Sequence, residues 1–233
     1  MKKIFRILFV LFISNQVAFG QGTDPVFHFG LKVVPNLGWI KTDDKDTKSD
    51  GSKLGFAYGL VTEFRFAENY AFATGLEVAY RNAKTKGSTT FEPTPGTTKD
   101  STYSRSMKLQ YIEIPLTLKL KTNEIGYFRY FLQIGVAPGF KIRARADDKG
   151  TVATSIGGGP TANLSYELEN KDIKDDIHGL NLSMVISGGV EYNISGNTNL
   201  ALGLVFNNGF LDIKDGGLTQ KSNYFGLSIG VLF

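Results

Sequence analysis

The sequence predicts an all-β protein, an eight-stranded antiparallel up-and-down transmembrane β-barrel, on three observations. Apolar residues alternate with small or polar residues in repeated runs, most of them reaching the roughly 9 to 11 residues that cross a bilayer as a tilted strand. Short and long connections alternate between these runs. The composition, with 27 Gly, 18 Phe, 10 Tyr and no Cys, and near-neutral hydropathy also suit a membrane barrel, whose inward residues are small or polar.

The N-terminal residues 1–20 have the layout of a secretory signal peptide. A basic start precedes an apolar run over 7–13, and the small residues Ala18 and Gly20 precede the expected cleavage site. The apolar run is shorter than the roughly 20 residues of a transmembrane helix. We therefore expect export with cleavage after Gly20, which leaves 21–233 as one outer-membrane β-barrel domain.

The net charge of +4 comes mostly from this N-terminal segment. Residues 1–20 hold three of the 26 Lys and Arg and no carboxylate, so the rest of the chain has 23 basic against 22 acidic residues. A nucleic-acid-binding protein needs a concentrated basic face, so we expect no nucleic-acid partner. The lack of Cys excludes a lipid-modified N-terminal Cys and any disulfide.

The clearest alternation runs from Leu54 to Phe66 and, after a turn, from Tyr70 to Arg81. On one face stand aromatic and aliphatic residues, and on the other stand Gly, Ala and charged residues, which is the period of two of a β-strand. The remaining predicted strands follow the same pattern and occupy residues 26–40, 111–120, 128–143, 180–192, 200–207 and 225–233.

The connections between these strands alternate in length. The short turns are predicted at 67–69, 122–126 and 195–199. The longer polar loops are predicted at 41–53, 83–106, 145–177 and 208–222. With an even number of strands, this alternation places the short turns and both termini in the periplasm and the long loops outside the cell. Within the predicted strands, Pro35, Pro115 and Pro138 cannot donate to the ladder, so we expect bulges or rim positions there.

The composition of the two faces separates a membrane barrel from a soluble, ligand-binding barrel of eight strands. Charged residues share a face with Gly, Ala and Ser, which suit a narrow interior, so the aromatic face is predicted to meet lipid. Because side chains just fill an eight-stranded barrel, we expect the inward charges to form an ion-pair network that closes the lumen. Its predicted members are Glu63, Arg65, Glu77, Arg81, Glu113, Lys119, Arg129, Lys141, Arg143 and Glu191.

Residues 110–119 read QYIEIPLTLK, and this stretch resembles the PorT-like outer-membrane β-barrel family of Bacteroidetes, in which a strand Y-[IL]-E-I-P-L-x-L-K recurs. Residues 29–36 and 230–233 are similar to the first and last strands of that family. The resemblance implies an eight-stranded barrel in the outer membrane. It also implies a link to type IX secretion and gliding, in which the founding member takes part. It carries over no catalytic or ligand residue.

The terminal Phe233, preceded by apolar residues at alternate positions, is similar to the C-terminal signal that the barrel assembly machinery recognises. The alternative is an ordinary residue at the end of the last strand.

Candidate catalytic and metal-binding residues are few. The only histidines, His28 and His178, fall at opposite ends of the predicted barrel, and no nucleophile motif surrounds Ser155, the loop serine that could serve with His178. Lys residues interleave the acidic residues of the first loop, which lack the EF-hand spacing. The acidic loop residues considered as calcium ligands are Asp43, Asp44, Asp46, Asp50, Asp172, Asp175 and Asp176. We therefore predict no enzymatic activity, metal or cofactor.

The function predicted from these features is a non-enzymatic barrel whose long outer loops bind or anchor a partner or support an envelope assembly. A part in type IX secretion rests on family resemblance alone, and a narrow small-solute porin is a further alternative. The expected partners are outer-membrane lipid, the barrel assembly machinery during biogenesis, and envelope or secretion proteins.

Overall fold

The structure, a computed structural model, describes residues 26–43, 47–157, 159, 161–214 and 219–233. The predicted signal peptide over 1–20 lies outside these residues. The described chain contains ten strands and one short 3-10 helix. In order these are β1 (Phe27–Thr42), β2 (Thr47–Ala67), β3 (Tyr70–Thr94), β4 (Thr97–Glu113), β5 (Leu116–Lys121), β6 (Phe128–Ile156), β7 (Ala162–Asp172), η1 (Lys174–Asp176), β8 (Leu180–Ser195), β9 (Thr198–Gly209) and β10 (Gln220–Leu232).

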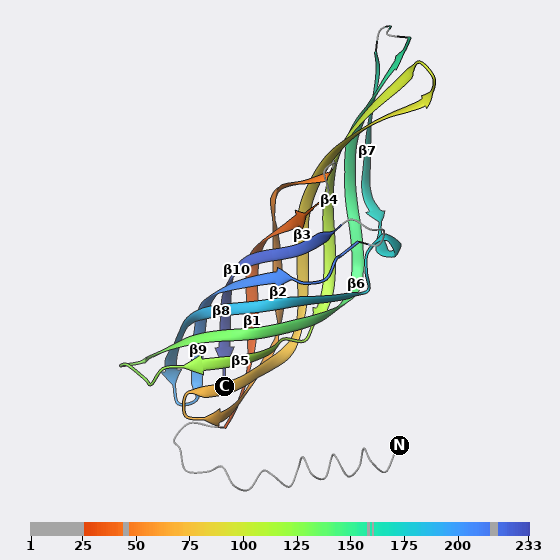
Figure 1. Cartoon of the computed structure of the whole chain (residues 1–233). Helices are drawn as coiled ribbons and strands as arrows, with labels where there is room; N and C mark the ends of the chain where they lie inside the picture. Colours follow the sequence, from red (N-terminus) through yellow and green to blue (C-terminus); the bar gives the residue numbers. More distant parts are fainter. Residues whose placement is uncertain (1–25, 44–46, 158, 160, 215–218) are drawn as a thin grey trace, which may run out of the picture.

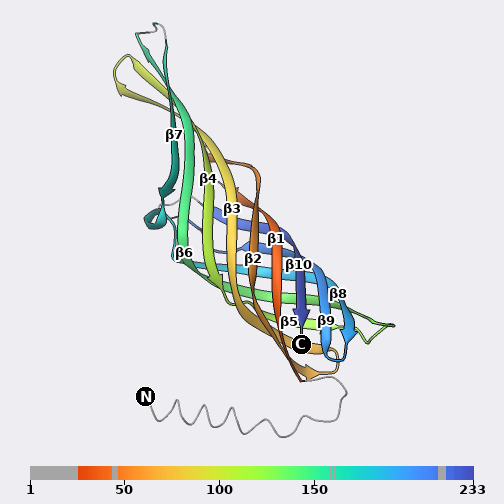
Figure 2. The ribbon, with the colours of Figure 1, turned by 180° about the vertical axis from the view of Figure 1, so that it is seen from behind.

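Eight strand positions form a closed antiparallel ring (Figures 1 and 2). β1 pairs with β2 on one side and with β10 on the other. From β2 the ring continues through β3, the position that β4 and β5 share, β6, β8 and β9 back to β10. β4 and β5 share one position, because each pairs with both β3 and β6. β7 pairs with β6 outside the ring. The predicted eight-stranded up-and-down barrel is confirmed.

The two ends of the barrel differ in their connections. The short links β2–β3, β5–β6 and β8–β9 lie at one end together with the C-terminus, and this end is called the turn end. At the other end, called the hairpin end, β3, β4, β6 and β7 continue beyond the ring as a narrow, twisted sheet (Figure 1). The three predicted short turns are confirmed.

Aromatic and aliphatic side chains cover the outside of the ring. Their exposed fractions reach 55% at Leu31, 47% at Phe56 and 53% at Leu204, while the residues between them along each strand are buried or half-buried. This outward apolar surface fits a bilayer rather than water. Aromatic pairs stand at the turn end, where the ring centroids of Phe27 and Phe64 are 5.0 Å apart, as in an interfacial girdle.

Glycine allows the barrel wall to curve sharply. A Cβ on Gly59 would lie 2.1 Å from the carbonyl oxygen of Leu76 on the neighbouring strand, and a Cβ on Gly75 would lie 2.1 Å from that of Leu60. Real Cβ atoms do not approach a backbone this closely. The backbones of β2 and β3 can therefore come this close only with glycine at both positions.

Three of the four predicted outer loops are largely strand. β2 begins at Thr47, β3 continues to Thr94 and β6 continues to Ile156, although 41–53, 83–106 and 145–177 were predicted to be polar loops. The pairing of β3 with β4 runs without a break from Glu77 opposite Glu113 into this region. These segments lack an apolar face, so the strands continue by hydrogen bonding to their neighbours, which sequence alternation does not reveal.

The prolines were predicted to mark bulges or rim positions, and none of the three produces a bulge. The pairing register is the same on both sides of Pro35, Pro115 and Pro138. Pro115 occupies the break between β4 and β5, whereas the other two lie within β1 and β6. The missing donors are accommodated by local gaps in the ladder, so the register is unchanged.

A bulge lies instead in β6 at Ile142. Tyr111 pairs with Lys141 while the preceding Gln110 pairs with Arg143, so β6 contains one extra residue. Before the bulge the buried residues of β6 have odd numbers, and after it they have even numbers, as at Ala144. An extra residue therefore exchanges the inward and outward faces of the rest of the strand.

Candidate functional site: barrel interior and hairpin-end groove

Four charged side chains meet inside the barrel near the turn end. Lys119 Nζ donates to Glu63 Oε1 and, at 2.5 Å, to Glu191 Oε1. Lys121 Nζ lies 2.7 Å from Glu63 Oε2 and 3.0 Å from Glu191 Oε2. The Phe131 ring adds a cation–π contact, 4.4 Å from Lys119 Nζ. Two cations and two anions thus balance while joining β2, β5 and β8 across the lumen.

A second network centres on Arg81, whose side chain is only 1% exposed. Its Nε lies 2.6 Å from Glu113 Oε1, and its other nitrogens donate to Asn207 Oδ1 at 3.0 Å, Ser183 Oγ at 3.0 Å and the carbonyl of Ser222 at 3.4 Å. The planar guanidinium offers five donors. One side chain on β3 therefore bonds to β4, β8, β9 and β10.

Two inward basic residues that form ion pairs were absent from the predicted set. Lys32 Nζ lies 2.7 Å from Glu77 Oε1, and Lys121 belongs to the cluster near the turn end. The sequence pattern indicates that both face inward. Lys32 lies two residues after the inward Gly30, and Lys121 lies two residues after Lys119.

The predicted Arg65 and Arg129 lie at the turn end, beside Glu63 and Lys121 of the first network. With His28 they line a cavity of about 140 Å³ at the mouth of the barrel. Arg129 Nη2 is 2.9 Å from Glu124 Oε2 in the adjoining turn. These residues therefore lie at the turn end, which the predicted orientation places in the periplasm.

The last two predicted lumen residues lie near the hairpin end. Lys141 Nζ donates to the carbonyl oxygens of Lys174, at 2.5 Å, and of Ile177. Arg143 is exposed, and its prediction as a lumen residue is wrong. The bulge at Ile142 is the cause, because it turns the side chains that follow it to the opposite face.

An apolar cluster covers the hairpin end of the lumen. The connection after β7 contributes Ile173 and Ile177, and the connection between β9 and β10 contributes Ile213. They pack against wall residues that include Leu109 and Ile40, and all five are at most 4% exposed. Sequence reasoning missed this cluster, whose only signal is isolated isoleucines within otherwise polar connections.

Little space remains between the networks and the apolar cluster. The cavity lined by Glu63, Glu113 and Lys119 has a volume of about 50 Å³. Side chains therefore fill most of the interior between these clusters.

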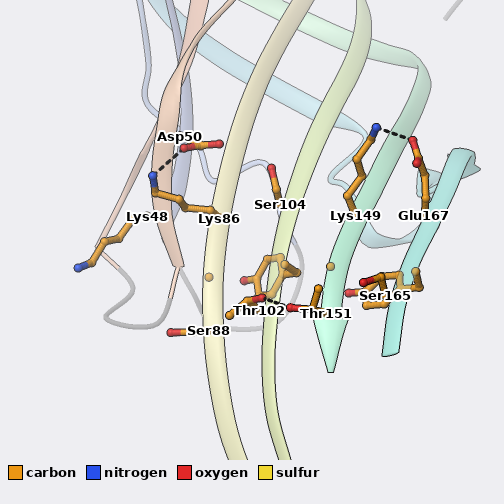
Figure 3. Close-up of a pocket in the computed structure, with 14 residues that line it drawn as sticks. Lys48, Asp50, Lys86, Ser88, Thr102, Ser104, Lys149, Thr151, Ser165 and Glu167 are labelled. Carbon is orange, nitrogen blue, oxygen red and sulfur yellow. Dashed lines mark hydrogen bonds and ion pairs between the residues drawn. The ribbon is translucent and has the colours of Figure 1, made fainter. Parts of the chain in front are cut away.

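A large hollow lies on the sheet at the hairpin end, and we call it the groove (Figure 3). Its volume is about 820 Å³. Its residues with the phase of the outward face are Lys48, Lys86, Ser88, Thr102, Ser104, Lys149, Thr151, Ser165 and Glu167. On β3, Lys86 is exposed whereas Thr85 and Ala83 are buried, so these residues have the phase of the outward face. The other lining residues Gly87, Tyr103, Gly150 and Tyr166 have the opposite phase.

Hydroxyl groups make the floor of the groove and ion pairs make its sides. Thr102 Oγ1 and Thr151 Oγ1 are 2.8 Å apart on β4 and β6. Lys86 Nζ lies 2.8 Å from Asp50 Oδ1, and this hydrogen bond lowers the pKa of Asp50. Lys149, bonded to Glu167 on β7, has a raised pKa for the same reason. The Asp50 carboxylate and the Lys149 ammonium are therefore charged at neutral pH.

The side chains considered for catalysis do not assemble. His28 is buried at the turn end, whereas His178 precedes β8 at the hairpin end, and Ser155 Oγ donates to the carbonyl of Gly159. Within the described ranges, no three His, Asp or Glu side chains are grouped so as to hold a metal ion. Asp44 and Asp46 lie outside those ranges. No described helix is long and apolar enough to cross a membrane.

Solved structures with a similar arrangement are outer-membrane proteins of low sequence identity. Neisserial surface protein A is 12% identical with a TM-score of 0.46, over 90% of this chain and 98% of that one. Ail of Yersinia pestis, solved with the heparin analogue sucrose octasulfate, is 15% identical with a TM-score of 0.37, over 90% and 100%. The outer membrane protease OmpT of Escherichia coli is 6% identical with a TM-score of 0.38, over 93% and 99%.

At these scores, the likeness bears on neither ligand nor activity. No curated protein matches the sequence. The profile of the outer membrane protein β-barrel domain family matches residues 19–215, which is most of the chain and includes the strands from β1 to β9. The chain belongs to the outer membrane protein β-barrel domain family.

Proposed function

We propose that this protein is a non-enzymatic outer-membrane anchor that displays a binding sheet outside the cell. The observation that carries the proposal is the contrast between the interior and the groove. The cavity in the lumen measures about 50 Å³, whereas the groove on the sheet at the hairpin end measures about 820 Å³. Binding outside, rather than passage through the barrel, fits this distribution of space.

The chemistry of the groove favours a carbohydrate as its ligand. Ser88, Thr102, Ser104, Thr151 and Ser165 supply hydroxyl groups, each of which both donates and accepts hydrogen bonds. Sugar hydroxyl groups have the same double capacity. The paired Lys and acidic residues at the sides add charged hydrogen-bonding groups that can orient such a ligand.

Binding to immobilised glycans tests this proposal, with the full chain in detergent micelles or nanodiscs. Wild-type protein is expected to bind a restricted set of glycans. Ser104→Trp, which fills the floor of the groove, is expected to weaken that binding at least about tenfold, since it removes both space and a hydroxyl group. Thr98→Trp, six residues before it on the same face of β4 and outside the groove, is the matched control and should bind like wild type.

Failure of wild-type protein to bind any glycan would contradict a carbohydrate ligand. Equal binding by Ser104→Trp would exclude the groove as the site. A narrow porin is the alternative that the filled lumen disfavours, and conductance measurements test it independently.

Export and assembly complete the proposal. Residues 1–20 act as a cleaved signal peptide, and the barrel assembly machinery recognises the C-terminal Phe233. In support, the Phe233 side chain is 54% exposed at the turn end while its backbone is paired with Phe29. N-terminal sequencing of the outer-membrane form, with Gln21 expected first, tests the cleavage.

A place in the PorT-like family and in type IX secretion is the specific alternative role. It rests on the resemblance of residues 110–119. Affinity purification from outer-membrane extracts tests it: co-purifying secretion components would support this role, and their absence with retained glycan binding would support the anchor.

A further inference from the structure

Five basic side chains gather on the outside of the barrel wall just beyond its apolar surface. They come from β2, β3, β4 and β6, and we call them the basic band. Its members are Lys53, Lys84, Lys108, Arg143 and Arg145. None of them lines the groove, and the groove lies further along the same strands.

Strand pairing brings these residues together. Lys108 pairs with Arg145 across β4 and β6, so their side chains leave the sheet on the same side. Lys84 pairs with Ser106, whose hydroxyl accepts a hydrogen bond from Lys53 Nζ. The band therefore occupies adjacent positions on one continuous face.

The bulge at Ile142 is what places both arginines in the band. With an uninterrupted register, odd-numbered residues of β6 would continue to point inward, as Ala137 and Lys141 do. The extra residue turns Arg143 and Arg145 outward and puts Ala144 and Ala146 in the buried positions. A bulge that re-aims side chains in this way is a specific feature of a strand rather than an irregularity.

The positive charge of the band is only partly balanced. Lys108 Nζ is 2.6 Å from Asp147 Oδ2, and Asp172 is paired with Arg145 in the ladder without forming an ion pair to it. Among the described residues, Lys84, Arg143 and Arg145 form no ion pair within 4.0 Å. Of the five cations, Lys108 is the one with a carboxylate partner within 4.0 Å among the described residues.

The cations also disturb one another. Burial lowers the pKa of Lys53, and the nearby charges of Lys108 and Lys84 lower it further, against the opposing effect of Asp147. Mutual repulsion of this kind is relieved when an anion binds between like charges.

The height of the band on the barrel identifies the anion. Phe140 and Ile142, which are 55% and 44% exposed, belong to the apolar surface directly below Arg143. A cation one residue beyond the apolar surface lies at the level of lipid headgroups, where Lys and Arg side chains extend towards phosphate. Above the band on β4, the outward residues are the hydroxyl-bearing Ser106 and Ser104, which suit a headgroup that continues as a sugar.

We propose that the basic band is a binding site for the phosphate groups of a phosphorylated glycolipid in the outer leaflet. The site is separate from the groove, so it stands whether or not the groove binds a carbohydrate. Arginine supplies planar, paired donors for phosphate oxygens, and the lysines supply additional charge.

Native mass spectrometry of the full chain in detergent micelles tests the site, with diphosphoryl lipid A as the probe. Its dephosphorylated form, phosphatidylglycerol and inorganic phosphate are the comparison ligands. We expect wild-type protein to retain diphosphoryl lipid A in preference to all three. Arg143→Gln/Arg145→Gln should reduce the apparent affinity about 30-fold, and Lys84→Gln alone about fivefold, from the usual contribution of each basic residue near an anionic surface.

The matched control is Lys99→Gln/Lys171→Gln, which removes the same charge elsewhere. Lys99 lies in the distant hairpin, and Lys171 of β7 pairs with the buried Ala146 of β6, so the control should bind within about twofold of wild type. Heat-dependent gel mobility confirms that each variant is folded.

Several results would overturn the proposal. Undiminished retention by the folded Arg143→Gln/Arg145→Gln and Lys84→Gln variants would exclude the band. An equal loss of affinity in the control variant would show that the effect comes from net charge alone. Equal retention of the dephosphorylated lipid would exclude phosphate, and equal retention of phosphatidylglycerol or inorganic phosphate would exclude the glycolipid as the specific ligand.

Discussion

At the scale of single residues, buried charges in the lumen are held by specific partners rather than by solvent. Arg81 and Glu113 are almost fully buried, and the arginine bonds to four strands besides its own. Taking one partner away leaves the other charge buried without compensation, which costs more than removing both.

Arg81→Met is therefore expected to lower the free energy of unfolding by about 3–5 kcal/mol, measured by urea titration in micelles. The double variant Arg81→Met/Glu113→Leu should recover much of this loss. Arg143→Met makes the same change at an exposed position and should alter the free energy by less than about 0.5 kcal/mol. Equal effects of the two single substitutions would contradict a structural role for the buried pair.

Asp147 gives a residue-scale dependence on pH at the hairpin end. The hydrogen bond from Lys108 and that from the backbone N–H of Asn170 lower the pKa of Asp147 below its ordinary 3.8. Its contribution to stability is thus complete above the ordinary value and is lost as pH falls through the lowered one.

The Asn170 amide is expected to keep its hydrogen-exchange protection at pH 5 and to lose it well below pH 3.8. Asp147→Asn keeps an oxygen acceptor but no charge, so its protection should be weaker at pH 5 and should not show this titration. Protection that does not change with acidification in the wild-type protein would show that Asp147 does not hold the backbone of β7 at Asn170.

At the scale of elements, the alternation of residues predicted the strands of the ring and their faces, but not their full lengths. The strands from Leu54 to Phe66 and from Tyr70 to Arg81 were predictable because one face meets lipid. Beyond the membrane neither face is apolar, so β3 and β4 continue there without a hydrophobic pattern. The bulge at Ile142 was equally invisible, since only pairing with β4 shows the extra residue.

The apolar cluster at the hairpin end gives an element-scale prediction. Ile173→Ala removes a side chain that is 2% exposed and should reduce the free energy of unfolding by about 2–5 kcal/mol, measured by urea titration. Ile156→Ala, at a position that is 70% exposed, is the control and should have little effect. Similar values for both variants would show that the connection after β7 does not close the barrel.

At the scale of the whole molecule, two charge networks and an apolar cluster close the interior along its length. In planar bilayers, the purified protein is therefore expected to show no stable, large single-channel conductance, because an eight-stranded barrel with a filled lumen leaves no continuous water path. A large porin reconstituted in parallel is the positive control. Stable large steps from this protein would refute the closed interior.

The sequence by itself determined the closed eight-stranded ring, the face that meets lipid and the short turns, since these follow from local alternation with a period of two. Only the tertiary structure decided which charges meet in the lumen, how Ile173 and Ile213 cover it, and that Arg143 points outward. The physical reason is that these features depend on the register between strands distant in sequence, where one extra residue exchanges the two faces.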